Sequence, residues 1–318
     1  MEKKELRLLI VIINYKTSKL VCEALCSLDG QINTSSDKVV VIDNASNDGS
    51  IDEISAFIKA RNWNNWIDLI PSNVNGGFSA GNNLGIKSAK AKYYLLLNSD
   101  AFVRDKAIEI MIQEMESNPK VGIVGPKLEW ENGEQQVSCF YNLTPWNTFL
   151  NTASTGILTR LFNKVGINEV AIPVDKFVQL PEWISFACVL IRNEAIQSIG
   201  LMDEGFFMYM EDVDYCRRIR KANWDILFCN KAKVVHLNNG YSNNLKIRKL
   251  PVYYYQSRAR YFIKYYGRIG FFMTNILWYL GRLVSISREY LQGKEKKISP
   301  DSYRDIWLGS WQRVNQYE

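Results

Sequence analysis

The 318-residue sequence holds a single histidine, no CxxC pair among its six cysteines, and neither of the common glycine motifs GxGxxG and GxxxxGK[ST]. The cysteine spacing excludes a metal finger and indicates reduced thiols, as in a cytosolic protein. The missing glycine motifs exclude the usual dinucleotide and P-loop cradles. A nucleotide site would need an acidic side chain that binds the nucleobase, an aromatic side chain stacked on the nucleobase and a metal ion at the phosphates.

Apolar runs long enough to span a bilayer are also lacking. The N-terminal stretch imitates a signal peptide, with charges before an apolar run, but no small-residue cleavage site follows. We therefore expect a buried first strand there. Near the other end, thirteen mostly apolar residues lie between Arg268 and Arg282, which is too short for a membrane span.

The composition is that of a folded protein with an uneven charge distribution. A hydrophobic content of 47% allows a large core, and the net charge is +6. Residues 246–297 contain twelve Lys or Arg and two Glu, and residues 253–279 contain eleven aromatic side chains. Such a segment favours contact with an anionic membrane surface first, packing on the domain or in a homodimer second, and nucleic acid last.

The first hundred residues alternate between β-branched apolar runs and segments with helical apolar spacing. The expected strands are 6–14, 38–43, 66–70 and 93–98, and the expected helices are 18–28, 50–60 and 77–90. Ser50 is the expected cap of the second helix. This order predicts an α/β fold with a mainly parallel sheet and right-handed crossovers.

The second half of the chain is less regular. A strand or strand pair is expected at 182–192, helices at 193–200 and 211–222, and strands at 225–229 and 232–237. Residues 141–175 show no clear period.

Polar residues follow each of the four strands in the first hundred residues. They are Asn14 and Tyr15, the run from Asp43 to Asp48, the run from Asn73 to Gly77, and the run from Asn98 to Asp100. Each cluster alone is ordinary turn chemistry. Because ligands of parallel sheets bind outside the carboxyl ends of the strands, all four together favour a shared site.

The stretch GFFMYMEDVDYCRR at residues 205–218 places three carboxylates directly after five large apolar residues. Acids in a first helical turn are routine, because the helix dipole favours them there. Apolar neighbours, however, exclude water and raise the pKa of a carboxylate, which makes it a better base. We assign Asp212 as the base and Glu211 as its support, and expect Asp214 to pair with Arg217 or Arg218.

His236 follows an apolar run, where a lone histidine is more often a core residue than a ligand. Its strand is expected to end beside the carboxylate site, so we favour a ligand role.

These residues together resemble a family-2 glycosyltransferase with the GT-A fold. The resemblance covers residues 6–245 and rests on VIINY, VIDNASNDGS, NGGFSAGNNLGI, LLLNSD, MYMEDVDYC and HLNNGYS in this order. Its NGGFSAGNNLGI and MYMEDVDYC versions are most similar to the bacterial rhamnosyltransferase branch, whose donors are dTDP-sugars.

The resemblance implies a role for each matching position. Tyr15 would pack on the pyrimidine base and Asp43 would accept its imide N–H. Asp212 would be the catalytic base. The remaining positions comprise two ligands of Mg²⁺ or Mn²⁺, Asp100 and His236, and four further nucleotide-binding residues, Asn75, Gly76, Asn82 and Ser99.

Three positions depart from the family pattern. Asn98 replaces the first Asp of the DxD element, and Asn82 stands where an Arg is common, so that one metal ligand and one phosphate contact are missing. Phe186 stands where a Gly is frequent and bears on the sugar or acceptor pocket.

The resemblance therefore implies a GT-A domain over residues 1–245, with a Rossmann-like mixed, mainly parallel sheet flanked by helices, and a basic aromatic helical extension over 246–318. The implied activity is metal-dependent, inverting transfer of a sugar, with L-rhamnose from dTDP-rhamnose as the suggested donor, to a lipid-linked or cell-surface glycan. The implied location is cytoplasmic, peripheral on the inner face of the cell membrane.

Three alternatives stay open. The donor could be a UDP-sugar, and the chain could be a non-catalytic nucleotide-sugar or membrane-binding module of the same fold. A nucleotidyltransferase is disfavoured, because NYKTSKL takes the place of the glycine-rich basic loop that such an enzyme has after its first strand.

Overall fold

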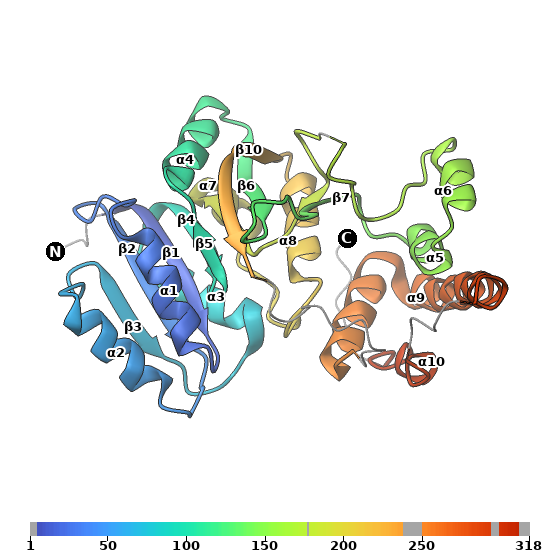
Figure 1. The fold of residues 1–318 in the computed structure, drawn as a ribbon, viewed down its shortest axis with the longest axis horizontal. Helices are drawn as coiled ribbons and strands as arrows, with labels where there is room; N and C mark the ends of the chain where they lie inside the picture. The colour runs from blue at the N-terminus through green and yellow to red at the C-terminus, as the bar shows by residue number, and fades with distance from the viewer. Residues whose placement is uncertain (1–4, 177, 238–249, 294–298, 312–318) are drawn as a thin grey trace.

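The computed structural model describes residues 5–176, 178–237, 250–293 and 299–311. They form an eight-stranded sheet with helices on both faces, joined to a group of helices at one end (Figure 1). The strands are β1 (Leu6–Asn14), β2 (Asp37–Asp43), β3 (Ile67–Pro71), β4 (Ala91–Asn98), β5 (Ala101–Val103), β6 (Val121–Glu129), β7 (Cys139–Phe140), β8 (Trp183–Ile184), β9 (Cys188–Arg192) and β10 (Asp225–His236). The helices are α1 (Ser18–Leu28), α2 (Ser50–Ala60), α3 (Gly77–Ser88), α4 (Ala107–Ser117), α5 (Pro145–Ala153), α6 (Gly156–Asn163), α7 (Asn193–Ile199), α8 (Glu211–Lys221), α9 (Val252–Leu291) and α10 (Ser302–Asp305).

The main sheet has the order β3-β2-β1-β4-β9-β6-β10-β5. The pairs among β1 to β4 are parallel, as is the pair of β6 with β10, whereas β9 runs antiparallel to both of its neighbours and β5 to β10. The sheet is therefore mixed and mainly parallel, as predicted. Its parallel part brings the carboxyl ends of β1, β2 and β4 to one edge.

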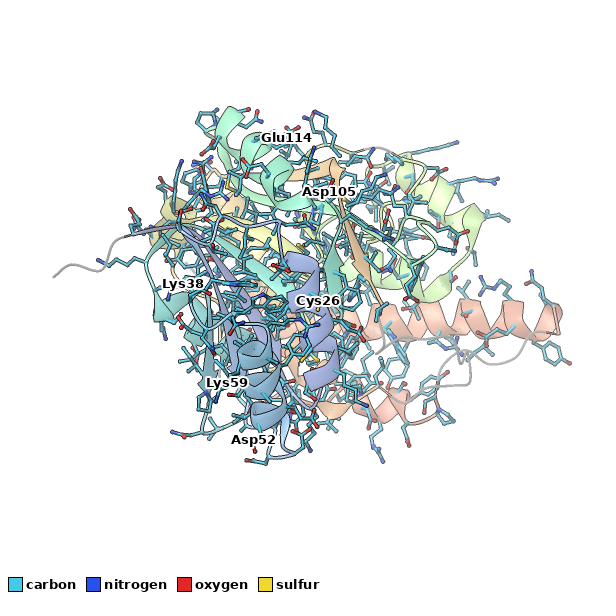
Figure 2. The ribbon with its side chains drawn as sticks, turned by 60° about the vertical axis from the view of Figure 1, so that its left-hand side comes forward. Cys26, Lys38, Asp52, Lys59, Asp105 and Glu114 are labelled. Carbon is cyan, nitrogen blue, oxygen red and sulfur yellow. The ribbon has the colours of Figure 1, made fainter. Side chains whose placement is uncertain are left out.

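Alternate residues of the central strands feed two separate cores. Leu8, Ile10 and Ile12 of β1 pack with α1, α2 and α4, and Leu9 and Val11 pack with α3, α7 and α8. This alternation follows from the two-residue repeat of a strand that is buried on both faces. Figure 2 shows the outer surface of the first helical layer, with labelled polar side chains such as Asp52 and Lys59.

Most of the predicted elements are confirmed within two residues of their expected ends, and the differences have local causes. Ser50 is the first residue of α2 rather than its cap, because Gly49 adopts the left-handed conformation (φ 87°) immediately before it. The two strands expected at 225–229 and 232–237 are one strand, β10, with a register shift between Cys229 and Lys233. Residues 141–175 contain α5 and α6, which the sequence pattern did not indicate.

Helix α9 is bent at Gly267, whose backbone angles (φ 68°, ψ 178°) are not helical. Both figures of the whole chain show it extending past the sheet (Figures 1 and 2). The first half of α9 shares a hydrophobic cluster with Phe206 and Val213. Helix α5 also packs against α9. Within the described residues, α9 is the one helix long and apolar enough for a membrane span by length and composition, and 39% of its most apolar window is buried in the protein.

Four of the six basic side chains of α9 bind partners within the protein and do not form the exposed cationic surface that the sequence suggested. Arg258 and Arg282 are buried and bind Asn275 and Glu289 within the helical extension. Arg260 and Lys264 bind acids of the sheet domain instead. These four cations therefore bind groups within the protein, because a cation removed from water needs a hydrogen-bonding or anionic partner. The basic residues at 246–249 and 294–297 lie outside the described residues.

The Gly77 position provides a test of the fold next to the sheet edge. Its φ is +81°, and an added Cβ would lie 2.0 Å from the carbonyl oxygen of Phe207, which accepts a hydrogen bond from Phe78 N–H. Gly30 has a similar φ of +73° with open space around it. We expect Gly30→Ala to lower the free energy of unfolding by about 1–2 kcal/mol. Gly77→Ala should cost at least about 2 kcal/mol more, since backbone must move. Urea unfolding measures both, and equal losses would contradict the close approach.

Candidate active site

A cleft with a volume of about 530 Å³ opens at the carboxyl edge of β1 and β4. The register of these two strands places Ile13 beside Asn98, so that the segments following both strands face the same space. The start of α3, residues Phe207 and Met208, and Tyr253 of α9 complete its walls. The cleft thus lies where a parallel sheet binds ligands, and the C-terminal extension contributes to it.

Four of the predicted nucleotide-binding residues line this cleft: Tyr15, Asn75, Asn82 and Ser99. Asp43 and Gly76 do not appear in the lining. The carboxylate of Asp43 is buried and accepts hydrogen bonds from Asn14 Nδ2 at 2.6 Å and from Ser46 N–H at 3.1 Å. In this structure Asp43 therefore braces the ends of β1 and β2 beneath the cleft.

Asn44 is a cleft residue to which the sequence gave no role. Its Nδ2 donates to Asn75 Oδ1 at 2.9 Å and to the Gly77 carbonyl at 3.1 Å, while Gly77 N–H also donates to Asn75 Oδ1. These bonds tie the end of β2 to the turn before α3. The signal in the sequence was its position in the polar run after the second strand.

Asp100 and His236 lie together, as the metal hypothesis requires. His236 Nε2 is 3.5 Å from Asp100 Oδ1, and Asp100 lines the cleft. His236 Nδ1 lies 3.3 Å from Gln136 Oε1, and Gln136 Nε2 donates to the His236 carbonyl at 2.6 Å. When Nδ1 carries the proton and donates it to Gln136, Nε2 presents its lone pair towards Asp100. Gln136 is thus an orienting residue that the sequence did not reveal.

This pair fits a hard divalent cation that completes its shell elsewhere. No group of three His, Cys, Asp or Glu residues capable of holding a metal occurs in the described part of the chain. Mg²⁺ is commonly bound by one or two protein groups together with substrate phosphates and water. Asp100 and His236 would supply the protein ligands, and Asn98, which also lines the cleft, leaves the site one carboxylate short of the usual set.

Glu211 and Asp212 begin α8 immediately after the cleft wall. Burial raises the pKa of Asp212 to about 6, although Val213 N–H donates to its Oδ1 at 2.8 Å. Burial, followed by the charge of Asp212, raises the pKa of Glu211 well above its ordinary value. Glu211 Oε2 is buried and has no hydrogen-bond partner among the described residues. This favours a protonated Glu211 beside an ionised Asp212, which suits the base role assigned to Asp212.

The backbone before α8 is strained. Tyr209 and Met210 both adopt positive φ values, 70° and 67°, which non-glycine residues rarely do. Tyr209 stacks on Tyr253 with ring centroids 5.9 Å apart, and Ser257 Oγ donates to the Met208 carbonyl. Strain of this kind persists only where the surroundings hold it, and here those surroundings are α9.

The other predicted residues of this region have structural contacts. Asp214 pairs with Arg218 at 3.0 Å, which confirms one of the two expected partners. Phe186 is buried against Tyr215 and is absent from the cleft lining. Asp212 itself is not in the lining either, although Phe207 and Met208, just before it in the chain, are.

Comparison with known proteins identifies this arrangement. The family model described as Glycosyl transferase family 2 matches residues 9–155, which include β1, β2, α3 and the Asn98–Asp100 turn. Residues 9–155, just under half of the chain, thus resemble a family 2 glycosyltransferase domain. This agrees with the family inferred from the motifs.

Two curated relatives match a larger share of the chain than the family model does. One is the low-salt glycan biosynthesis hexosyltransferase Agl10 of Haloferax volcanii, 26% identical over 233 residues that cover 71% of this chain and 66% of the relative. The other is the N-acetylglucosaminyl-diphospho-decaprenol L-rhamnosyltransferase of Mycobacterium tuberculosis, 24% identical over 226 residues that cover 62% and 66%. The chain thus spans just under two thirds of the length of these relatives.

A solved structure confirms the fold of this chain. GalNAc-T7 with UDP, GalNAc and Mn²⁺ superposes with a TM-score of 0.58 and 13% identity, covering 82% of this chain and 49% of that one. At this identity the likeness shows the GT-A fold and leaves the ligands of this chain to be inferred from its own residues.

The Asp100–His236 pair predicts cation-dependent nucleotide binding. We expect Mn²⁺ to strengthen UDP or dTDP binding to the wild type in calorimetry, and Asp100→Asn to weaken the Mn²⁺-dependent part by about 10–100-fold. Gln136→Leu should weaken it in the same direction, because His236 loses its orienting partner. Asp105→Asn removes an exposed carboxylate nearby and serves as the control. Unchanged Mn²⁺ dependence in Asp100→Asn would rule out this pair as the metal site.

Proposed function

We propose that the protein is a metal-dependent, inverting glycosyltransferase that moves a sugar from a nucleotide diphosphate donor to a hydroxyl acceptor. The observation that supports this most is that Asp100, which contacts His236, lines a cleft whose wall leads directly into the buried Glu211 and the half-buried Asp212. Such a reaction needs a site for the leaving diphosphate and a base for the attacking hydroxyl, and these are the two groups.

Each part of the site has a role in this proposal. A bound Mg²⁺ or Mn²⁺ would neutralise the charge that develops on the leaving diphosphate. Tyr15, Asn75, Asn82 and Ser99 would hold the nucleotide along the cleft, with Asp43 fixing the strand ends below it. Asp212 would accept the proton of the acceptor hydroxyl, a contribution of roughly 10²–10⁴-fold. A single displacement of this kind inverts the anomeric centre and requires no enzyme nucleophile.

For the substrates we propose L-rhamnose from dTDP-rhamnose and a lipid-linked glycan acceptor. The support is the family 2 relative that is named as a decaprenol-linked L-rhamnosyltransferase. A UDP-sugar is the alternative donor, since GalNAc-T7 was crystallised with UDP. A lipid-linked acceptor would place the enzyme on the cytoplasmic face of the membrane.

The second half of α9 offers a surface for that membrane contact. Its exposed face carries a line of apolar side chains, which we call the apolar stripe: Ile269, Phe272, Met273, Leu280, Leu283, Ile286, Tyr290 and Leu291. No exposed acid interrupts it, because Glu289 is buried and paired with Arg282. Since Arg258, Lys264 and Arg282 of α9 are buried, lipid contact would depend on apolar burial more than on charge.

The base assignment predicts a specific loss of turnover. Asp212→Asn should lower kcat for nucleotide diphosphate release by about 10²–10⁴-fold while leaving nucleotide affinity close to that of the wild type. Because a base must be ionised and the pKa of Asp212 is about 6, kcat of the wild type should fall about tenfold per pH unit below that value. A panel of dTDP- and UDP-sugars supplies the donors.

The matched control is Asp52→Asn, which removes another acid from the first turn of a helix, α2; Asp52 is exposed and outside the cleft lining. It should keep full activity. Retained turnover in Asp212→Asn would reject the base. Release of no nucleotide diphosphate from any donor by the wild type would favour the non-catalytic alternative.

The apolar stripe predicts membrane binding that survives salt. The chain should float with vesicles of phosphatidylcholine and phosphatidylglycerol, and Leu280→Ser combined with Leu283→Ser should release it, because both side chains are exposed in the fold. Ile51→Ser on α2 is the control, being an exposed apolar residue elsewhere. Unchanged flotation of the double variant, or a wild-type dimer in sedimentation that the same variant dissociates, would overturn lipid as the contact.

A further inference from the structure

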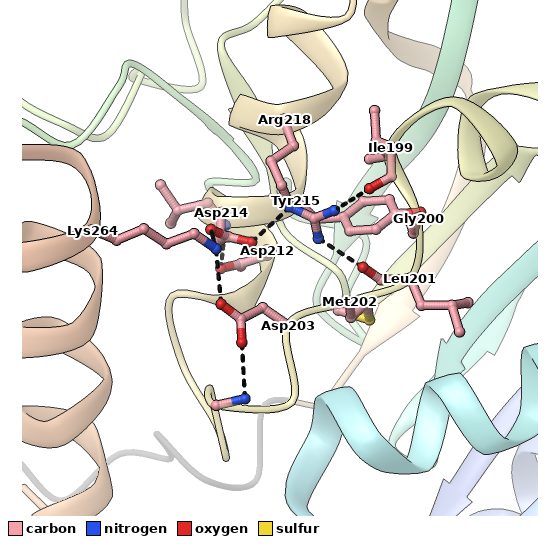
Figure 3. A network of polar contacts seen from close by, with 12 residues as sticks. Ile199, Gly200, Leu201, Met202, Asp203, Asp212, Asp214, Tyr215, Arg218 and Lys264 are labelled. Carbon is pink, nitrogen blue, oxygen red and sulfur yellow. Dashed lines mark hydrogen bonds and ion pairs between the residues drawn. The ribbon is translucent and has the colours of Figure 1, made fainter. Parts of the chain in front are cut away.

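Lys264, in the first half of α9, lies between two carboxylates of the sheet domain (Figure 3). Its Nζ is 2.5 Å from Asp214 Oδ1 and 2.8 Å from Asp203 Oδ2. The side chain is 1% exposed, so both contacts are made out of water. One ammonium group therefore joins two points of the chain that are separated by the cleft wall.

Asp203 is the first of these points. Arg260, one helical turn before Lys264, donates to it at 2.7 Å, and Gly205 N–H donates to its Oδ1 at 3.0 Å. Burial opposes the ionisation of Asp203, but the hydrogen bonds from Lys264 and Arg260 prevail and lower its pKa to about 2. Asp203 is therefore a fixed anion at any physiological pH.

Asp214 is the second point, and it is fully buried. Besides Lys264 it binds Arg218 at 3.0 Å and accepts a hydrogen bond from Tyr265 Oη at 2.7 Å. Arg218 in turn donates to the carbonyl groups of Ile199 and Leu201. Figure 3 shows this chain of contacts running from α9 through Asp214 to the turn that precedes Asp203.

The segment between the two aspartates contains the parts of the site that need to be held. Phe207 and Met208 line the cleft, and Tyr209 and Met210 carry the strained backbone. Glu211 and Asp212 follow. Left-handed backbone is unfavourable for a non-glycine residue, so this segment would relax if its ends were free to move.

We propose that Lys264 is a positioning residue, which clamps both ends of the 203–214 segment and thereby holds Asp212 in place for the acceptor hydroxyl. This inference rests on the proposed function. It assigns to the C-terminal extension a part in the reaction, although Lys264 touches no substrate. Lys264, one of the basic residues that the sequence suggested as lipid contacts, would instead hold the catalytic base in position.

Lys264 can be removed without leaving a buried charge alone. In Lys264→Met, Asp203 keeps Arg260, and Asp214 keeps Arg218 and Tyr265. Met has nearly the length of the lysine stem and should fill the space. The variant therefore removes the link between the two carboxylates while each carboxylate keeps a cationic partner. We expect it to fold.

Two measurements test the proposal. Hydrogen exchange at residues 205–212 should be at least about tenfold faster in Lys264→Met than in the wild type, because local opening of the segment becomes easier. In the donor assay, kcat should fall about 10²-fold, as expected for a misplaced base, while KM for the nucleotide sugar stays within about threefold. Lys264→Arg, which keeps the cation, should recover part of kcat.

Arg282→Met is the control, because it breaks an internal ion pair of the same helix away from the 203–214 segment. It should lower the melting temperature without changing exchange at 205–212 or kcat. Unchanged exchange in Lys264→Met overturns the clamp, and faster exchange with unchanged kcat overturns its role in positioning Asp212. A wild type that is inactive with every donor defeats the proposed function, and with it the positioning role, whatever the exchange shows.

Discussion

The parallel pairing of β1 with β2 and β4 is the constraint on which the rest of the molecule depends. It brings the carboxyl ends of three strands to one edge, and each end carries a short polar segment. Parallel strands require crossover helices, and these bury both faces of the sheet. The polar side chains can then gather only at the edge. There Asn14 binds Asp43 and Asn44 binds Asn75, while Tyr15, Ser99 and Asp100 face the cleft.

The second wall of the cleft has a different origin. It is an irregular segment that carries two left-handed residues and leads into a pair of buried carboxylates. No sheet hydrogen bonds hold this segment. Its support comes from Gly77 on one side, where only a glycine allows the approach of Phe207, and from α9 on the other. In the proposed reaction the sheet would supply the nucleotide side of the site, and the helical extension would support the side where the acceptor reacts.

Sequence patterns predicted the strands and helices that are determined by the residues within each segment. Runs such as residues 6–14 and 93–98 are strands because they are mainly apolar, and the alternation of strands and helices predicted the parallel sheet. The grouping of Asp100 with His236 followed from a family pattern that spans residues far apart in the chain. Such a pattern carries information on tertiary structure that periodicity does not.

The features that the sequence did not predict depend on contacts between segments far apart in the chain. Gln136 precedes its partner by 100 residues, and nothing around it marks it as a residue that orients a histidine. The sequence shows that α9 is basic, but it does not show which way its cations point. Arg260 and Lys264 turn towards Asp203, which lies more than fifty residues earlier in the chain. Helix α5 was not predicted because it packs on α9, which comes much later in the chain, and α6 was not predicted because none of its residues is buried.

The bend at Gly267 has a consequence for how chemistry and location are connected in this protein. Before it, α9 contributes Tyr253 to the cleft and Lys264 to the ion pairs with Asp203 and Asp214, and after it the same helix carries the apolar stripe. A single pair of backbone angles therefore sets the angle at which the cleft faces any surface on which the stripe rests. The depth and tilt at which an acceptor could be presented are geometrically linked to one glycine.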